Sequence, residues 1–242
     1  MILTYGDSKR GLVRKVNEDA IYTGAENLCF LADGMGGYDG GQVASSLAVQ
    51  SAVRYFLSGE KSFSRESLRE SFYQANQAIL AEKKDEPSLQ SMGTTMIGAA
   101  LEDSRLYWAH VGDSRLYIYR NEELTQVTTD HSFVMELVSE GKLSKEEMRV
   151  HPRKNEITRA IGIESDLKVD TGCIDLTDDT CILICSDGVS GPLDDEKIKS
   201  ILSSGERKTV EDLEVLGKKL MAAVYETGAK DNASYILIQY WN

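Results

Sequence analysis

Aspartates stand at one end of four apolar, strand-like runs of this sequence, each beside Gly, Asn or Ser. They are Asp33 after residues 28–32, Asp113 after 108–111, Asp187 after 182–186 and Asp231 before 233–238. In an antiparallel sheet the carboxyl end of one strand lies beside the amino end of its neighbour. We therefore expect all four carboxylates to share one rim.

Such a cluster of carboxylates would bind cations. Carboxylates this close cannot all stay ionised alone, because like charges raise one another's pKa. Ligands that are all oxygen select the hard ions Mn²⁺ or Mg²⁺ over Zn²⁺ or Cu²⁺. Gly34 follows Asp33 directly, and a residue without a side chain lets its carbonyl turn toward an ion.

The alternative is that these Asp-Gly and Asp-Asn pairs only make turns at strand ends, which is their commonest use. For any single pair the turn is the better interpretation. Four acids in the same kind of place, in a chain with a net charge of −12, favour the cation site instead.

The strands that would position these acids are short runs rich in β-branched and aromatic residues and bounded by Gly, Asp or Asn. We expect strands at residues 2–6, 28–32, 94–101, 106–111, 116–120, 181–185 and 234–240. Residues 181–185 are apolar at both alternating sets of positions, so both faces of that strand should be covered.

Helical periodicity of apolar residues marks three longer segments, at residues 43–56, 68–79 and 213–224. Strands at hairpin spacing with helices between groups of them indicate an α+β fold rather than a βαβ repeat. We predict a four-layer sandwich, in which two antiparallel β-sheets pack face to face and antiparallel α-helices flank them.

Composition limits the class of protein. The 242 residues are 41% hydrophobic and 27% charged, as in ordinary globular proteins, and no Pro/Ser-rich linker or repeat divides them. We predict one domain over residues 1–242 and a monomer. The negative net charge argues against nucleic acid or an anionic membrane as partner, because both need clustered Lys and Arg.

The sequence also indicates the cellular location of the protein and the redox state of its cysteines. The amino terminus lacks the basic-then-apolar order of a signal peptide, and no stretch reaches the ~18 apolar residues that span a bilayer. We expect a cytoplasmic protein. Because Cys29, Cys173, Cys181 and Cys185 form no CxxC pair, we predict reduced, buried thiols.

Nine short segments around the acids occur in a distinctive order along nearly the whole chain. They are RKVNEDA at 14–20, DGMGG at 33–37, GGQVAS at 40–45, SMGTT at 91–95, HVGDSR at 110–115, DHS at 130–132, ITRAIG at 157–162, CSDG at 185–188 and DN at 231–232. This series resembles the metal-dependent Ser/Thr protein phosphatases of the 2C type (PPM family), in their compact bacterial form. The resemblance implies the same sandwich and hydrolysis of phosphoserine and phosphothreonine in proteins.

The resemblance also implies a set of metal ligands for two tightly bound ions and a third, weaker one, Mn²⁺ or Mg²⁺. Asp33 would bridge the first two, and Gly34 would offer its carbonyl to the first. Asp187 and Asp231 would bind the second. Asp113, together with Asp187, would hold the third.

Four further residues would assist. By the same resemblance, Arg14 would bind the phosphate, and its planar fork can contact two oxygens where a lysine could not. Glu18 and Asp19 would bind the ions directly or orient their water molecules, the second role being favoured for Asp19, and Asn232 would support the ligands from behind. Asp33, Asp187 and Asp231 with Arg14 would form the catalytic set.

The chemistry implied is attack on phosphorus by a water held between two metal ions about 3.5–4 Å apart, whose pKa is lowered toward ~7. Met35 and Tyr38 stand where relatives carry histidines, so the usual histidine acids are missing. We expect a metal-bound water to protonate the leaving alkoxide, with Tyr38 as the alternative.

Two other functions stay open on the sequence. One is an inactive relative that binds phosphoproteins without hydrolysis, and the other is a phosphohydrolase acting on small phosphate esters. If the protein is an active protein phosphatase, its resemblance to bacterial members implies that it opposes a Ser/Thr kinase.

The resemblance assigns residues 137–156 to a mobile flap beside the metals. Ser144, with an acid at Glu147, predicts a helix start there. Residues 151–155 are the most basic short stretch of the chain. They are either a solvated helix end or a patch in which Arg153 and Lys154 steer acidic phosphopeptides to the site.

Overall fold

The strands form two antiparallel sheets in the computed structural model, which describes residues 1–24, 27–37, 39–59 and 62–242. The first sheet has the order β1 (Ile2–Lys9), β11 (Ala233–Tyr240), β10 (Thr180–Cys185), β7 (Arg115–Arg120) and β8 (Glu123–Gln126). The second has the order β2 (Asp19–Thr23), β3 (Leu28–Met35), β5 (Met96–Glu102), β6 (Arg105–Val111) and β9 (Asp170–Asp175), with β4 (Gly93–Thr94) paired to β3.

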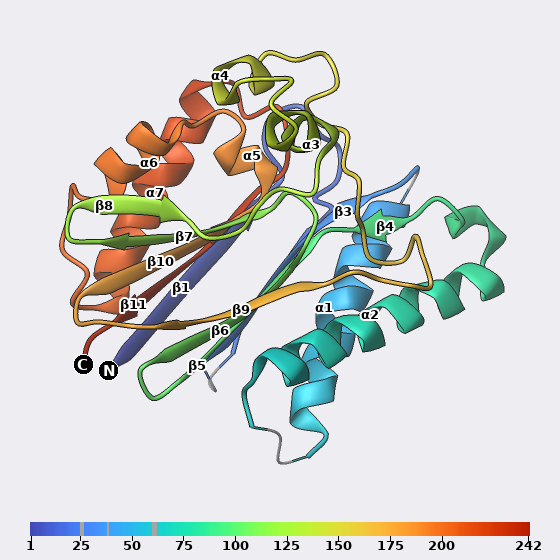
Figure 1. Ribbon diagram of the computed structural model, residues 1–242, viewed down its shortest axis with the longest axis horizontal. Helices are drawn as coiled ribbons and strands as arrows, with labels where there is room; N and C mark the ends of the chain where they lie inside the picture. The colour runs from blue at the N-terminus through green and yellow to red at the C-terminus, as the bar shows by residue number, and fades with distance from the viewer. Residues whose placement is uncertain (25–26, 38, 60–61) are drawn as a thin grey trace.

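Helices cover the outer face of each sheet (Figure 1). The long pair α1 (Gly40–Leu57) and α2 (Arg65–Asp85) packs on the second sheet, and α2 leads into the short 3₁₀ helix η1 (Pro87–Leu89). On the first sheet lie α6 (Asp195–Leu202) and α7 (Val210–Glu226). The predicted four-layer α+β sandwich is therefore confirmed.

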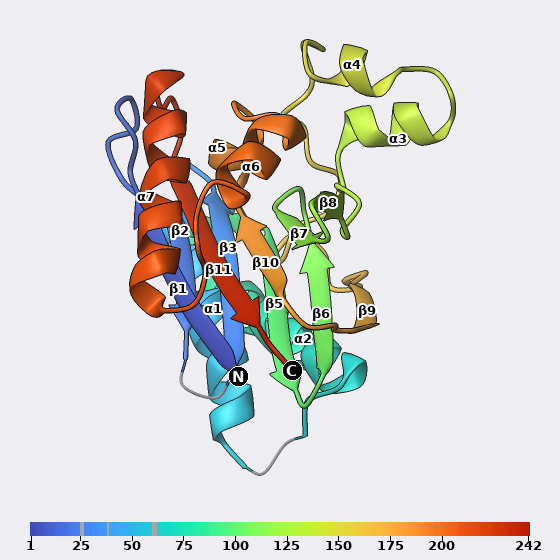
Figure 2. The ribbon, with the colours of Figure 1, turned by 90° about the vertical axis from the view of Figure 1, so that its left-hand side faces the viewer.

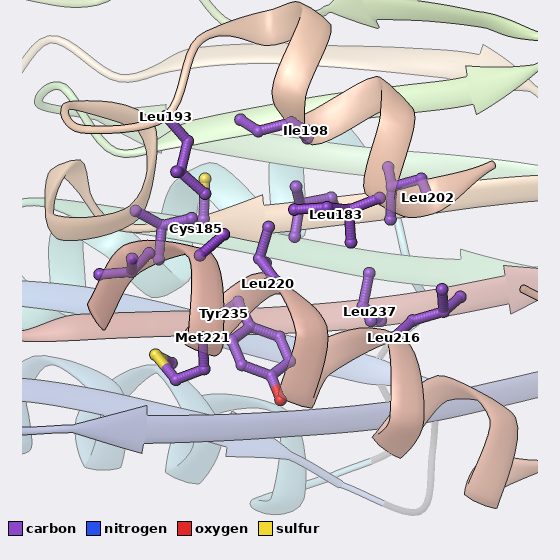
Figure 3. Close-up of a cluster of buried hydrophobic side chains, with 14 of the residues drawn as sticks. Leu183, Cys185, Leu193, Ile198, Leu202, Leu216, Leu220, Met221, Tyr235 and Leu237 are labelled. Carbon is purple, nitrogen blue, oxygen red and sulfur yellow. The ribbon is translucent and has the colours of Figure 1, made fainter. Parts of the chain in front are cut away.

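The apolar core is divided into three layers by the two sheets. Leu183 and Cys185 of β10 point into the layer under α6 and α7, where they meet residues such as Ile198 and Leu220 (Figure 3). Ile182 and its alternating neighbours point into the layer between the sheets. Both faces of β10 are thus covered, as its unbroken apolar run predicts.

The structure adds three strands to those expected and divides one. β2, β8 and β9 each lie at the edge of a sheet and are half exposed, so their sequences lack a strong apolar pattern. The expected strand at 94–101 is interrupted at Thr95, because Thr94 pairs with β3 and Ile161 while β5 begins at Met96.

The cysteines correct one prediction. All four are free thiols, and Cys29, Cys181 and Cys185 are buried, but Cys173 is exposed on the edge strand β9. Within the described part of the chain, no helix has the length and apolar character to cross a bilayer.

A two-helix segment projects beyond the sheets (Figure 2). It holds α3 (Phe133–Ser139) and α4 (Lys145–Met148). The predicted helix start is confirmed: Ser144 Oγ accepts from the Glu147 amide at 3.2 Å, and Glu147 Oε2 accepts from the Ser144 amide at 2.8 Å. The base of the segment is fixed by a bridge between Ser132 and Ile157.

Candidate active site

The four aspartates singled out in the sequence line one cavity where the rims of the two sheets meet. Asp33 lies near the end of β3 and Asp113 follows β6, while Asp187 begins the short helix α5 (Asp187–Ser190) and Asp231 precedes β11. We call this the rim cavity; its volume is about 220 Å³. Its walls also include Arg14, Glu18, Gly34, Met35, Gly36, Thr95, Asn155, Ile157 and Asn232.

Two threonines hold the backbone of Asp33. Thr95 Oγ1 accepts from the Asp33 amide at 3.1 Å, and the Asp33 carbonyl accepts from the Thr95 amide at 2.9 Å and from Thr94 Oγ1 at 2.8 Å. Thr95 Oγ1 also shares a hydrogen bond of 2.9 Å with Ser114 Oγ. Thr95 therefore joins Asp33 to the turn that carries Asp113, a role that the sequence reasoning missed although the SMGTT segment contains it.

Asn232 fastens the loop that carries Arg14 and Glu18. Its Oδ1 accepts from the Glu18 amide at 2.9 Å, and its Nδ2 donates to the carbonyls of Arg10 and Val16, each at 2.9 Å. Its backbone also lies against Gly188, where an added Cβ would stand 1.8 Å from the Asn232 carbonyl oxygen. Only glycine after Asp187 lets α5 approach β11 this closely.

Asp19 lies behind the rim cavity. It faces Asp33 as its Cα partner between β2 and β3, and it does not line the cavity. Its Oδ2 accepts from Ser234 Oγ at 2.6 Å and from Ser186 Oγ at 3.0 Å, whereas its buried Oδ1 has no hydrogen-bond partner. Burial raises the pKa of Asp19 to about 7, against the lowering effect of the two serines.

The carboxylates of the rim disfavour one another's ionisation. Burial, followed by the charges of Asp19 and Asp187, raises the pKa of Asp33 well above its ordinary value. Burial and Asp187 act likewise on the pKa of Asp113, and burial and Asp231 raise that of Asp187. A cation that neutralises these charges would stabilise such a cluster.

Arg14 lies at the mouth of the rim cavity with about half of its side chain exposed, and it is ion-paired with Asp231. Its Nη2 donates to Asp231 Oδ2 at 2.7 Å. Among the residues that the structure describes, no three His, Cys, Asp or Glu side chains already converge as ligands of one ion. The candidate metal ligand Asp231 instead forms an ion pair with the candidate phosphate ligand Arg14.

The donor set nevertheless fits a hard divalent cation. The rim cavity presents the carboxylates of Asp33, Asp113, Asp187 and Asp231 together with the backbone of Gly34, which are all oxygen donors. The unpartnered Asp19 Oδ1 and the raised pKa values of the rim acids mark an under-neutralised cluster. Mn²⁺ and Mg²⁺ are the ions that such donors select.

The histidines make their contacts outside the rim cavity. His131 Nδ1 accepts from the Gly112 amide at 3.1 Å, and its ring packs on that of His110 with 4.6 Å between centroids. His151 Nδ1 accepts from the Arg153 amide at 3.1 Å. In the described part of the chain no histidine lines the rim cavity, and Tyr38 lies outside the described residues.

Comparison with known proteins agrees with this geometry. A family model described as protein phosphatase 2C matches residues 13–212. Serine/threonine phosphatase stp of Listeria monocytogenes is 35% identical over 238 residues, covering 95% of this chain and 92% of that protein.

Solved structures agree over the whole chain. The crystal structure of the serine/threonine phosphatase PstP/Ppp of Mycobacterium tuberculosis is similar with a TM-score of 0.91 and 33% identity, covering 100% of this chain and 99% of that chain. The catalytic domain of PstP in complex with two manganese ions has a TM-score of 0.89 and 33% identity, with the same coverage.

Proposed function

Because this chain belongs to the protein phosphatase 2C family, we propose that it hydrolyses phosphoserine and phosphothreonine in proteins with divalent metal ions held at the rim cavity. One observation carries the proposal: Asp33, Asp113, Asp187 and Asp231 line a single cavity together with Arg14. The manganese complex of a structural relative supports Mn²⁺, and Mg²⁺ satisfies the same donor chemistry.

We assign the ligands as follows. Asp33 and the Gly34 carbonyl would hold one ion, Asp33 with Asp187 and Asp231 a second, and Asp113 with Asp187 a third and weaker one. When bound, the ions supply a water of lowered pKa as nucleophile and neutralise charge on the phosphoryl group.

The other residues prepare this site. Arg14 would leave Asp231 for two oxygens of the phosphate, since an exposed guanidinium reorients readily and prefers a bidentate oxyanion. Asn232 keeps the Arg14 loop in place through its three hydrogen bonds to backbone. Asp19 and Glu18 would orient ligands or water from behind the rim.

The remaining features of the function are also proposals. We treat residues 1–242 as one monomeric catalytic domain, with residues 137–156 as a flap. The free thiols support a reducing compartment, the cytoplasm. There the enzyme would oppose a bacterial Ser/Thr kinase in signalling. The ions, when bound, would also supply acidic water for the leaving group.

The test is hydrolysis of para-nitrophenyl phosphate and of a phosphothreonine peptide, with Mn²⁺ and with EDTA. We expect Mn²⁺-dependent turnover of both substrates. No turnover of either would favour the inactive phosphoprotein-binding relative. Turnover of small esters but not of phosphopeptides would favour the small-ester phosphohydrolase.

A further inference from the structure

A second cavity lies under the two-helix segment and adjoins the rim cavity. Asp113, Asp187 and Asn155 line both cavities, so the two are adjacent. We call the second one the flap cavity; its volume is about 80 Å³, room for a few water molecules or a carboxylate group. Arg149 and Lys154 line it from the flap.

Three acids and three cations line the flap cavity, and metal bound to two of the acids would leave Arg149 and Lys154 uncompensated. Asp130 is neutralised by Arg115, whose Nη2 donates to it at 2.7 Å and whose Nε donates at 3.0 Å. Asp113 and Asp187 would be neutralised by metal. Within the described residues, neither Arg149 nor Lys154 has a carboxylate within 4.0 Å.

Arg153 and Lys154, which the sequence suggested as a pair, have different surroundings in the structure. Arg153 donates to both carboxylate oxygens of Glu156, at 2.6 and 2.5 Å, and its guanidinium lies 3.5 Å from the centre of the Phe133 ring. Glu156 neutralises the charge of Arg153, so Arg153 is the less available of the two cations to an acidic substrate. The side chain of Arg149 donates to the Leu193 carbonyl, at 3.3 Å.

We propose that the flap cavity is a subsite in which Arg149 and Lys154 bind an Asp or Glu side chain of the substrate, a few residues from the phosphorylated residue. The inference rests on the proposed function, because it needs a phosphorylated polypeptide in the rim cavity. Because the two cavities are adjacent, a side chain near the phosphorylated residue lies within reach of the flap cavity. The unpaired cations there attract a negative charge.

The experiment measures kcat/KM on phosphothreonine peptides that differ only by Glu or Gln at each of the positions near the phosphothreonine. For wild type with Mn²⁺, we expect the Glu peptide to be favoured about fivefold at one position or more, the worth of one partly exposed ion pair. The preference should shrink at high salt.

Variants assign that preference to the flap cavity. In Arg149→Gln/Lys154→Gln the ratio of Glu to Gln peptide should fall to about one. Lys145→Gln is the matched control, because Lys145 is an exposed cation of the same flap that does not line the cavity. It should keep the wild-type ratio. Arg149→Glu/Lys154→Glu, which reverses both charges, should invert the preference toward an added peptide with Lys at that position.

The ratios of kcat/KM between Glu and Gln peptides test the subsite separately from the proposed phosphatase activity. Equal kcat/KM of wild type on all the peptides would overturn the subsite and leave the phosphatase standing. A ratio that survives in the double variant, or falls equally in Lys145→Gln, would also overturn it. No cleavage of any peptide would overturn the proposed function and this inference with it.

Discussion

Single residues at the rim differ in what they contribute, because some would touch the ions and others hold those that do. Asp33 and Asp187 are partly buried among like charges, whereas Arg14 is half exposed at the mouth. Replacing such an acid by its amide keeps its shape and removes its charge. Replacing Arg14 removes its ion pair with Asp231 and the proposed contact to substrate, but no proposed metal ligand.

We expect Asp33→Asn to abolish Mn²⁺-dependent turnover while the protein stays folded. The amide cannot neutralise a cation, yet it suits a position where burial and neighbouring acids disfavour charge. Circular dichroism and the rate on para-nitrophenyl phosphate are measured on the same sample. Asp166→Asn, at an exposed position away from the rim, is the control. A folded Asp33→Asn enzyme with the wild-type rate would contradict the ligand assignment.

Arg14→Ala should lower kcat/KM about tenfold or more, mainly through KM, because one charge-assisted contact to phosphate is lost. Its affinity for Mn²⁺ should not fall, since Arg14 now competes for Asp231. Titration calorimetry and steady-state kinetics separate the two effects. Arg10→Ala removes an exposed cation from the same loop and serves as control; an equal loss in both variants would place Arg14 outside the phosphate site.

At the scale of elements, the site depends on breaks in regular structure as much as on strands. Thr95 interrupts the run between β4 and β5, and this break lets its hydroxyl meet both the Asp33 amide and Ser114. These two hydrogen bonds of Thr95 link β3 to the turn after β6.

Thr95→Val should destabilise the protein by about 1–3 kcal/mol, because it keeps the volume but leaves the Asp33 amide and the Ser114 hydroxyl without that partner. For a chain of this size the melting temperature should fall by roughly 3–10 °C. Thermal unfolding without metal measures the change. Thr95→Ser keeps the hydroxyl and should recover most of the loss; equal melting of Thr95→Val and wild type would show these hydrogen bonds to be dispensable.

At the scale of the whole molecule, metal binding should couple the two sheets. Asp33 belongs to β3 of the second sheet, and Asp187 and Asp231 belong to segments that flank strands of the first. Asp113 lies in the connection from β6 of the second sheet to β7 of the first. An ion that binds acids from both sheets stabilises the folded state and not the unfolded state, because its ligands are far apart in the unfolded chain.

Saturating Mn²⁺ should therefore raise the melting temperature relative to EDTA. At about 100 times Kd the gain is about 2.7 kcal/mol, which corresponds to roughly 5–10 °C for this size. Scanning calorimetry with Mn²⁺, Mg²⁺ and EDTA measures it. The shift should be smaller in Asp187→Asn. A melting temperature indifferent to metal in wild type would contradict a site between the sheets.

The sequence alone determined the core strands, the three long helices and the placement of the acids at strand ends. These depend on local alternation, helical periodicity and turn chemistry, which a few neighbouring residues express. Half-exposed edge strands such as β8 and β9 carry too little of that pattern and were missed.

Only the tertiary structure decided which side chains meet. Arg14 pairs with Asp231 across 217 positions of sequence, and Thr95 bonds Ser114 from a neighbouring strand. Adjacent Arg153 and Lys154 look alike in the sequence, yet one is held by Glu156 and the other lines the flap cavity. A side chain's partners depend on packing between distant segments, and no local pattern contains that information.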